Sequence, residues 1–230
     1  MEIRDKLAIV TGVSKGIGLA VAKALLDEGA FVAGWSRSKP DLAHDRFHFF
    51  ETDVTGFDHV QNSYEATCNH FGKDPVILVN NAGLGYNGKV EEIDMEKWHT
   101  MFDVNVHGLF YCTRTAVPAM KKAGEAHIIN IASIAGLNGI EEMSGYVASK
   151  HAVRGISHSL MKELRNDGIK VTCVYPGSVE TDFFNNITGS SGSSNKMRAE
   201  DVATTVVETL RTHPNYLIAD VEMRPLQPKK

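Results

Sequence analysis

The sequence predicts an α/β protein with one doubly wound parallel sheet, in a single domain that spans residues 1–230. Three observations favour this fold. Short apolar segments of strand length alternate along the whole chain with amphipathic helical patterns. The first of these strands runs directly into a glycine-rich turn and a helix. Polar or glycine-bearing turns follow the later strands, at the edge where open parallel sheets bind their ligands.

Composition limits the class of protein. The chain has 230 residues, 43% of them hydrophobic, which is enough for one sizeable core and short for two domains. A net charge of −4 and short basic clusters argue against a nucleic-acid or membrane surface. Neither a signal peptide nor a membrane-spanning stretch is visible, so we expect a cytoplasmic protein. Three scattered cysteines and the histidine spacing predict no disulfide and no metal site.

The first strand, residues 6–10, precedes the turn T-G-V-S-K-G-I-G and a helix over residues 19–28. Glycines let backbone N–H groups approach a phosphate, and the following helix N-terminus favours negative charge. A P-loop is excluded because three residues, not four, separate Gly12 from Gly16. The nucleophile elbow G-x-S-x-G, with Ser14 as nucleophile, stays an alternative, although too few residues precede it to complete an oxyanion hole.

The second strand, residues 30–35, ends in Ser36 and Arg37. An acid at this point of a dinucleotide fold would hold the ribose 2′-hydroxyl, whereas an arginine suits a 2′-phosphate. Lys15, in the glycine turn, could reach the same phosphate from the other side. These residues predict a preference for NADP(H), with NAD(H) possible.

The other elements follow in order. Asp53 comes after a short strand, Asn105 lies inside a long helix, and Ser133 follows another strand. The long helix is apolar on more than one side, which indicates an oligomer interface. The loop 185–195, rich in Gly and Ser, is a possible lid. The expected strands are 47–51, 75–79, 127–131, 170–175 and 216–219, and the expected helices are 56–71, 96–121, 144–164 and 199–211.

Tyr146 and Lys150 are four residues apart in one predicted helix, so they share a face. Free tyrosine loses its proton near pH 10 and is a poor proton donor at neutral pH. A lysine charge about 5 Å away, at an effective dielectric of about 20, would stabilise the phenolate by about 3 kcal/mol. We therefore expect the pKa of Tyr146 to be lowered by roughly two units, toward a useful acid–base range.

Together, these motifs resemble the short-chain dehydrogenase/reductase family along nearly the whole chain, in particular its single-domain, NADP-preferring branch. The family pattern is matched by T-G-x-x-x-G-x-G at residues 11–18, N-N-A-G at residues 80–83, Asn105, Ser133, Tyr146 and Lys150, and Pro176, Gly177 and Thr181. The resemblance implies a Rossmann fold, a nicotinamide cofactor and a homotetramer or homodimer.

The resemblance also implies roles. Ser133 would polarise a carbonyl, Tyr146 would exchange the proton, Lys150 would lower the tyrosine pKa and hold the nicotinamide ribose, and Asn105 would help to position a water. The implied cofactor-binding residues are Gly12, Ser14, Lys15, Gly16, Ile17, Gly18, Ser36, Arg37, Asp53, Val54, Asn81, Ala82, Gly83, Tyr146, Lys150, Pro176, Gly177, Val179 and Thr181.

The expected activity is NADP(H)-dependent hydride transfer to or from a small carbonyl or alcohol substrate. The expected substrate pocket is mostly apolar and favours a neutral, modest-sized ketone or aldehyde; its residues are Leu84, Tyr86, Leu137, Ile140, Met143, Phe183 and Phe184, with Glu141 and Glu142 nearby. Two alternatives stay open: a β-ketoacyl thioester reductase, and a dinucleotide-sensing regulator without turnover.

Overall fold

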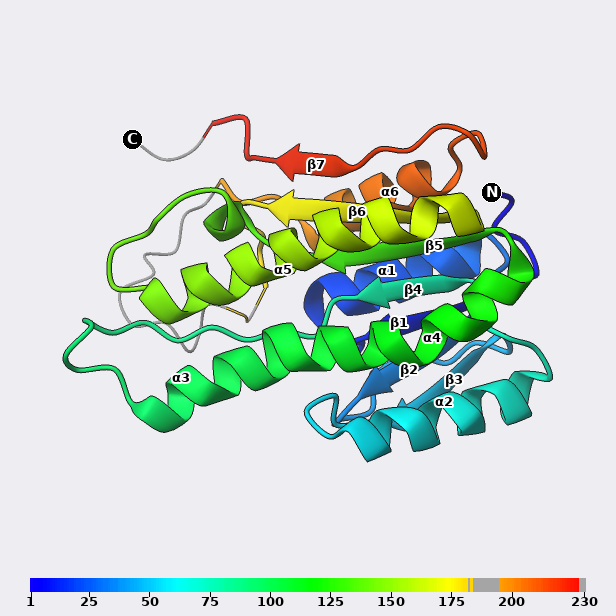
Figure 1. The fold of residues 1–230 in the computed structure, drawn as a ribbon, viewed down its shortest axis with the longest axis horizontal. Helices are drawn as coiled ribbons and strands as arrows, with labels where there is room; N and C mark the ends of the chain where they lie inside the picture. The colour runs from blue at the N-terminus through cyan, green and yellow to red at the C-terminus, as the bar shows by residue number, and fades with distance from the viewer. Residues whose placement is uncertain (182, 184–194, 228–230) are drawn as a thin grey trace.

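The computed structural model describes residues 1–181, 183 and 195–227, where a parallel sheet lies between two layers of helices (Figure 1). The strands of these residues are β1 (Leu7–Thr11), β2 (Phe31–Ser36), β3 (Phe47–Glu51), β4 (Ile77–Asn80), β5 (Ala126–Ile131), β6 (Ile169–Pro176) and β7 (Asp220–Met223). Their order across the sheet is β3-β2-β1-β4-β5-β6-β7. The predicted doubly wound fold is confirmed.

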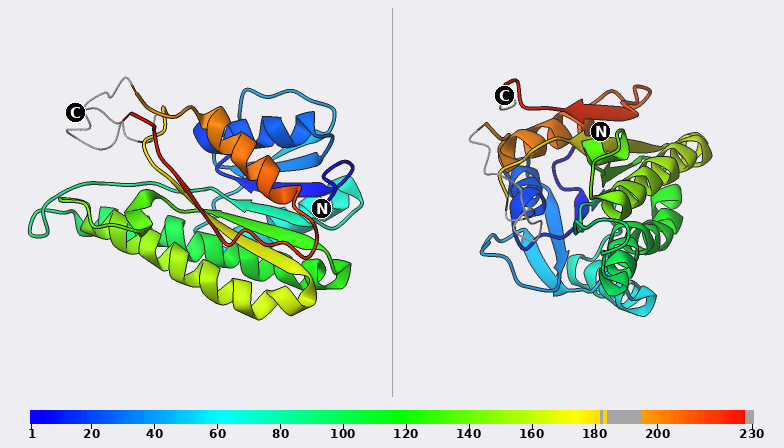
Figure 2. Two further views of the ribbon diagram at one scale, coloured as in Figure 1. Left: turned by 90° about the horizontal axis from the view of Figure 1, so that it is seen from above. Right: turned by 90° about the vertical axis from the view of Figure 1, so that its left-hand side faces the viewer.

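The helices fall into two groups. Helices α1 and α6 pack together on one face of the sheet, and α2, α4 and α5 cover the other (Figure 2). Their bounds are α1 (Gly16–Asp27), α2 (Phe57–Phe71), α3 (Met95–Phe102), α4 (Leu109–Ala123), α5 (Ser144–Leu164) and α6 (Ala199–Leu210). This arrangement buries the central strands on both sides, which is why they read as continuous apolar runs.

The direction of winding reverses between β1 and β4. From β1 the chain moves outward to β2 and β3, and from β4 it moves the other way to β7. The segments that follow β1 and β4 therefore turn away from each other at the carboxyl ends of these two neighbouring strands. Open α/β sheets bind ligands at such a reversal, so the topology alone places a site here.

The predicted helix over residues 96–121 is not one continuous α-helix. A π-helix, Asp103–Gly108, separates α3 from α4. A side-chain carbon on Gly108 would lie 2.7 Å from Cγ2 of Val54, so glycine allows the helix to pass close to the loop after β3. Short π-helical turns inside α-helices often occur at functional sites, and this one contains Asn105.

The predicted last strand, residues 216–219, is wrong. Side chains of β6 bind the carbonyls of this segment, with Lys170 Nζ donating to the Tyr216 carbonyl and Thr172 Oγ1 to that of Ile218. The strand β7 begins at Asp220 and alternates exposed acids with half-buried Val221 and Met223. The charged residues concealed this period-two pattern from the sequence analysis.

Candidate active site

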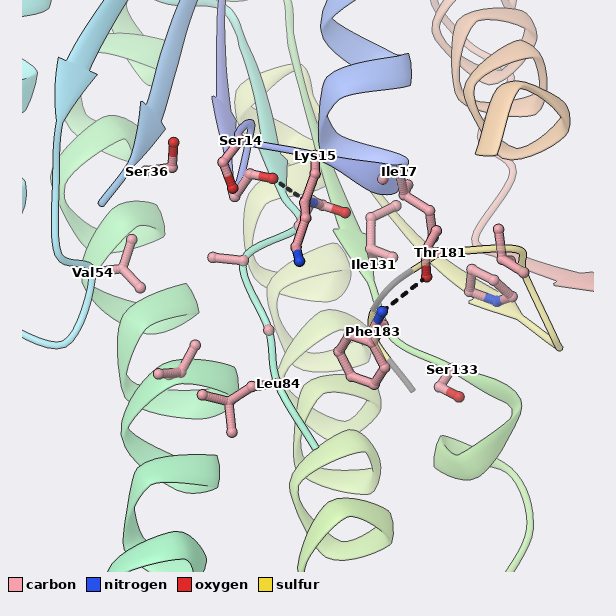
Figure 3. A pocket seen from close by; sticks show the side chains of 18 of the residues that line it. Ser14, Lys15, Ile17, Ser36, Val54, Leu84, Ile131, Ser133, Thr181 and Phe183 are labelled. Atoms are coloured by element: carbon pink, nitrogen blue, oxygen red, sulfur yellow. Dashed lines mark hydrogen bonds between the residues drawn. The ribbon is translucent and has the colours of Figure 1, made fainter. Parts of the chain in front are cut away.

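One cavity of about 420 Å³ lies at the carboxyl ends of the strands (Figure 3). It extends from the glycine turn after β1 to the N-terminal part of α5. The sequence-predicted residues that line it are Gly12, Ser14, Lys15, Gly16, Ile17, Ser36, Arg37, Asp53, Val54, Asn81, Ala82, Gly83, Ser133, Tyr146, Lys150, Pro176, Gly177, Val179 and Thr181. The fold thus brings nearly all the predicted site residues together.

The glycine turn is shaped by backbone that other residues rarely adopt. Gly12 and Gly16 have φ of +68° and +60°, in the left-handed region that glycine enters without steric cost. Gly18 does not line the cavity. A side-chain carbon there would lie 2.3 Å from the Gly12 carbonyl oxygen, so this glycine allows α1 to pack beneath the turn rather than meeting a ligand.

A hydrogen-bonded joint holds the ends of β1 and β4 at a fixed spacing. Thr11 Oγ1 accepts from the backbone N–H groups of Asn81 and Ala82, both at 2.9 Å. The Asn81 side chain donates in return to the carbonyls of Thr11 and Gly12, at 2.9 and 3.2 Å. The asparagine after β4 therefore fixes the turn after β1 from across the crevice.

The far end of the cavity carries the predicted 2′-phosphate residues. Ser36 is buried and donates to the Ser38 carbonyl at 2.8 Å, while Arg37 and Lys15 are exposed at the surface. Asp53 accepts two hydrogen bonds from Thr55. Burial opposes ionisation of Asp53, but these bonds and the Arg37 charge hold its pKa below the usual value.

Tyr146 and Lys150 lie on the same face of α5, and both line the cavity. The Lys150 Nζ is 5.9 Å from the centre of the Tyr146 ring and donates to the Ile131 carbonyl at 3.0 Å. Burial raises the pKa of Tyr146 to about 12, although a hydrogen bond with Ser133 lowers it. Burial also lowers the pKa of Lys150 to about 8.

These directions correct the sequence expectation for the phenol. The expected downward shift of the Tyr146 pKa assumed a charged lysine nearby in a medium of moderate dielectric. Both groups are instead almost fully buried, and the loss of hydration disfavours phenolate and ammonium alike. In this structure the tyrosine keeps its proton over the neutral range, and the lysine loses its proton more readily than in water.

Asn105 does not line the cavity. Its side chain is 1% exposed and forms a two-way bond with Leu84, accepting from the backbone N–H and donating to the carbonyl, both at 2.9 Å. It also donates to Ser149 Oγ, which donates in turn to the Tyr146 carbonyl. The π-helix is thereby connected both to the loop after β4 and to α5.

The other end of the cavity is apolar. Of the predicted substrate residues, Leu84, Tyr86 and Phe183 line it. Leu137, Ile140 and Met143 do not, and Glu141 and Glu142 are exposed. Phe184 and residues 185–194 of the predicted lid lie outside the described residues.

Further lining residues were not predicted. They are Trp35, Ser38, Thr52, Val104, Ile131 and Ala132. Most of them are immediate neighbours of predicted residues at strand ends, so extending each strand-end motif by one residue would have found them. Val104 belongs to the π-helix, which the sequence analysis did not predict. Within the described part of the chain, no group of three or more His, Cys, Asp or Glu side chains could hold a metal, and no helix could cross a bilayer.

Comparison with known proteins identifies the class. The family model for short chain dehydrogenases matches residues 6–191, and the chain belongs to this family. An uncharacterized oxidoreductase of Staphylococcus saprophyticus is 35% identical over 238 residues, which cover 98% of this chain and 100% of the relative. The resemblance inferred from the motifs is confirmed.

Two solved structures show the same fold. An alcohol dehydrogenase of the archaeon Thermococcus sibiricus, complexed with 5-hydroxy-NADP, is 25% identical with a TM-score of 0.86, covering 99% of this chain and 100% of that one. A 3-ketoacyl-(acyl-carrier-protein) reductase of Brucella melitensis, complexed with NADH, has a TM-score of 0.87 at 24% identity, with 96% and 97% covered. The protein is an NAD(P)-dependent oxidoreductase.

Proposed function

We propose that the protein is an NADP(H)-dependent enzyme that interconverts a small, neutral carbonyl compound and its alcohol. The observation that carries this proposal is the meeting of Ser133, Tyr146 and Lys150 in one cavity with a glycine turn. A proton donor, a hydroxyl and a buried amine are the groups that reduction of a carbonyl needs beside a hydride source.

The cavity fits a dinucleotide. Left-handed glycines at positions 12 and 16 expose backbone N–H groups at the start of α1, where a helix N-terminus favours a phosphate. Asp53, Gly177 and Thr181 line the same cavity, and Thr181 lies beside Gly16 of the turn. When bound there, the nicotinamide dinucleotide supplies or accepts the hydride.

Each catalytic side chain has a separate task. In reduction, Tyr146 donates its proton to the substrate oxygen, and a pKa of about 12 keeps that proton in place at neutral pH. Ser133 Oγ accepts from the Ala135 backbone N–H at 3.1 Å, so its own hydrogen can point to the same oxygen. The Lys150 ammonium, 5.9 Å from the centre of the Tyr146 ring, stabilises the phenolate that forms when the proton leaves, and its pKa of about 8 keeps it charged near physiological pH.

The preference for NADP(H) rests on the absence of an acid after β2. Ser36 occupies the position where an acid would hold a ribose hydroxyl, and Arg37 and Lys15 both line this end of the cavity. A dianionic phosphate gains from two nearby cations that a ribose hydroxyl would not use. The NADP analogue in the Thermococcus alcohol dehydrogenase supports the same choice.

The preference for a neutral substrate rests on the opposite end. Leu84, Tyr86 and Phe183 carry no charge. The amine of Lys150 is already bonded to the Ile131 carbonyl. A carboxylate substrate would therefore enter this site without a dedicated cation to pair with.

The proposal includes self-association. Phe110, on α4, is a large apolar side chain that is 46% exposed, and it lies on the helical segment whose second apolar side indicates an interface. Light scattering should give a mass of two or four chains, and Phe110→Lys should lower it.

Enzymatic turnover of carbonyl compounds tests the proposed function. NADPH oxidation should be measured with a panel of ketones and aldehydes, comparing the native protein with Tyr146→Phe and with Tyr216→Phe, an exposed tyrosine far along the chain. We expect consumption that Tyr146→Phe abolishes and Tyr216→Phe leaves intact. Tight NADPH binding without turnover of any carbonyl would instead support the dinucleotide-sensing regulator.

A further inference from the structure

We infer that the substrate carries an aromatic ring close to its carbonyl group, and that Tyr86 and Phe183 select for this ring. The inference rests on the proposed function, because it concerns the substrate end of the same cavity. It specifies the chemistry of the group beside the reacting carbon.

The ring of Phe183 lies beside the catalytic tyrosine. The centres of the Phe183 and Tyr146 rings are 5.7 Å apart, and the two planes are inclined by 53°. Phe183 is half-buried and points into the cavity in Figure 3. A group attached to a carbonyl carbon beside Tyr146 therefore meets an aromatic wall.

Gly85 keeps these rings close together. A side-chain carbon at this position would lie 3.0 Å from Cδ2 of Tyr146 and 3.4 Å from Cε1 of Phe183. The buried glycine backbone thus packs against both rings. Leu84 and Tyr86, on either side of it, line the cavity, so the wall continues along the segment that follows β4.

Tyr86 is held from outside the cavity. The Lys97 ammonium lies 5.5 Å from the centre of its ring, within the range of a cation–π contact. The backbone N–H of Gly88 donates to the Glu142 carbonyl at 2.8 Å, which ties the same segment to the loop before α5. Glu142 has φ of +59°, which is a strained conformation for a residue other than glycine. Its carbonyl is the acceptor of the hydrogen bond from Gly88.

An aromatic wall distinguishes rings by more than size. The edge of one aromatic ring is positive and its face negative, so tilted pairs gain energy that a saturated ring of the same size does not. This gain corresponds to about a two- to tenfold difference in binding. Because the described side chains at this end carry no charge apart from Lys150, the ring that fits is a neutral one.

The experiment compares two ketones that differ only in the ring. In 1-phenylpropan-2-one and 1-cyclohexylpropan-2-one a methylene separates the ring from the carbonyl, so the two carbonyls have similar intrinsic reactivity. Butan-2-one serves as the substrate without a ring. The measured quantity is the ratio of kcat/KM for the phenyl and cyclohexyl ketones, in which differences in the amount of active enzyme cancel.

We expect the native protein to favour the phenyl ketone about two- to tenfold. Phe183→Leu and Tyr86→Leu should each bring the ratio toward one, Tyr86→Phe should preserve it, and the remote control Tyr216→Leu should leave it unchanged. A native ratio near one, or a ratio unaltered in both leucine variants, would overturn the inference while carbonyl reduction stands. If the native protein reduces no carbonyl compound, the proposed function fails, and the inference fails with it.

Discussion

Replacing Lys150 with methionine should stabilise the cofactor-free protein while abolishing its turnover. The pKa of this lysine falls from 10.5 to about 8 because the ammonium is buried. At about 1.4 kcal/mol per unit, the folded state holds the charge at a cost of roughly 3 kcal/mol. Leaving the buried Ile131 carbonyl without this donor offsets about 1 to 3 kcal/mol, which leaves a net gain of up to about 2 kcal/mol.

The gain has a defined pH dependence. Below pH 8 both the folded and the unfolded chain hold the proton, so the native protein bears the full cost of burial. Between pH 8 and 10.5 the folded protein loses the proton while the unfolded chain keeps it, so the cost shrinks as pH rises. The advantage of Lys150→Met should therefore be largest at pH 7 and fade toward pH 10.

Urea unfolding of both proteins between pH 7 and 10, followed by far-UV circular dichroism, measures this difference. Lys162→Met is the matched control, because Lys162 is an exposed lysine on the same helix. Its effect should be small and independent of pH. A Lys150→Met protein that is less stable at pH 7, or a difference that does not change with pH, would refute the argument from burial.

Three more outcomes are expected. The kcat/KM for reduction should fall as pH rises through about 8, where Lys150 loses its proton, and a pH–rate profile that stays flat to pH 10 would contradict this. Arg37→Ala should raise the KM for NADPH about tenfold and leave that for NADH nearly unchanged, as steady-state assays with both cofactors would reveal. Gly85→Ala should lower kcat about tenfold, since its new carbon would lie 3.0 Å from the Tyr146 ring; unchanged kcat, with folding verified by circular dichroism, would disprove it.

The strand-end motifs were predictable because few residue types satisfy their local geometry. Glycines with positive φ at positions 12 and 16 follow a buried strand, in a conformation that other residues rarely adopt. Asn81 likewise follows β4 directly, and Ser133 lies two residues after the end of β5. The carboxyl ends of parallel strands meet at one edge of the sheet. Recognising that these residues follow strands was therefore enough to predict that they line one cavity.

What escaped the sequence analysis depends on burial and on contacts between distant segments. The four-residue spacing placed Lys150 beside Tyr146, but spacing carries no information on hydration, so the direction of the tyrosine pKa was wrong. Gly18 belongs to the predicted motif, yet its role is helix packing. Asn105 lies in a π-helix and does not line the cavity, and Gly108, which ends this π-helix, packs against Val54, a residue about fifty positions earlier in the chain.

Strand β7 contributes to the site although it is the last strand of the described chain. The Met223 carbonyl accepts from the backbone N–H of Gly177 at 2.8 Å, which braces the turn after β6 where it lines the cavity. During synthesis, residues 220–223 leave the ribosome after every catalytic side chain has emerged. The nascent protein can thus form its glycine turn and most of its sheet early, but this part of the pocket acquires its support only after residues 220–223 have been made.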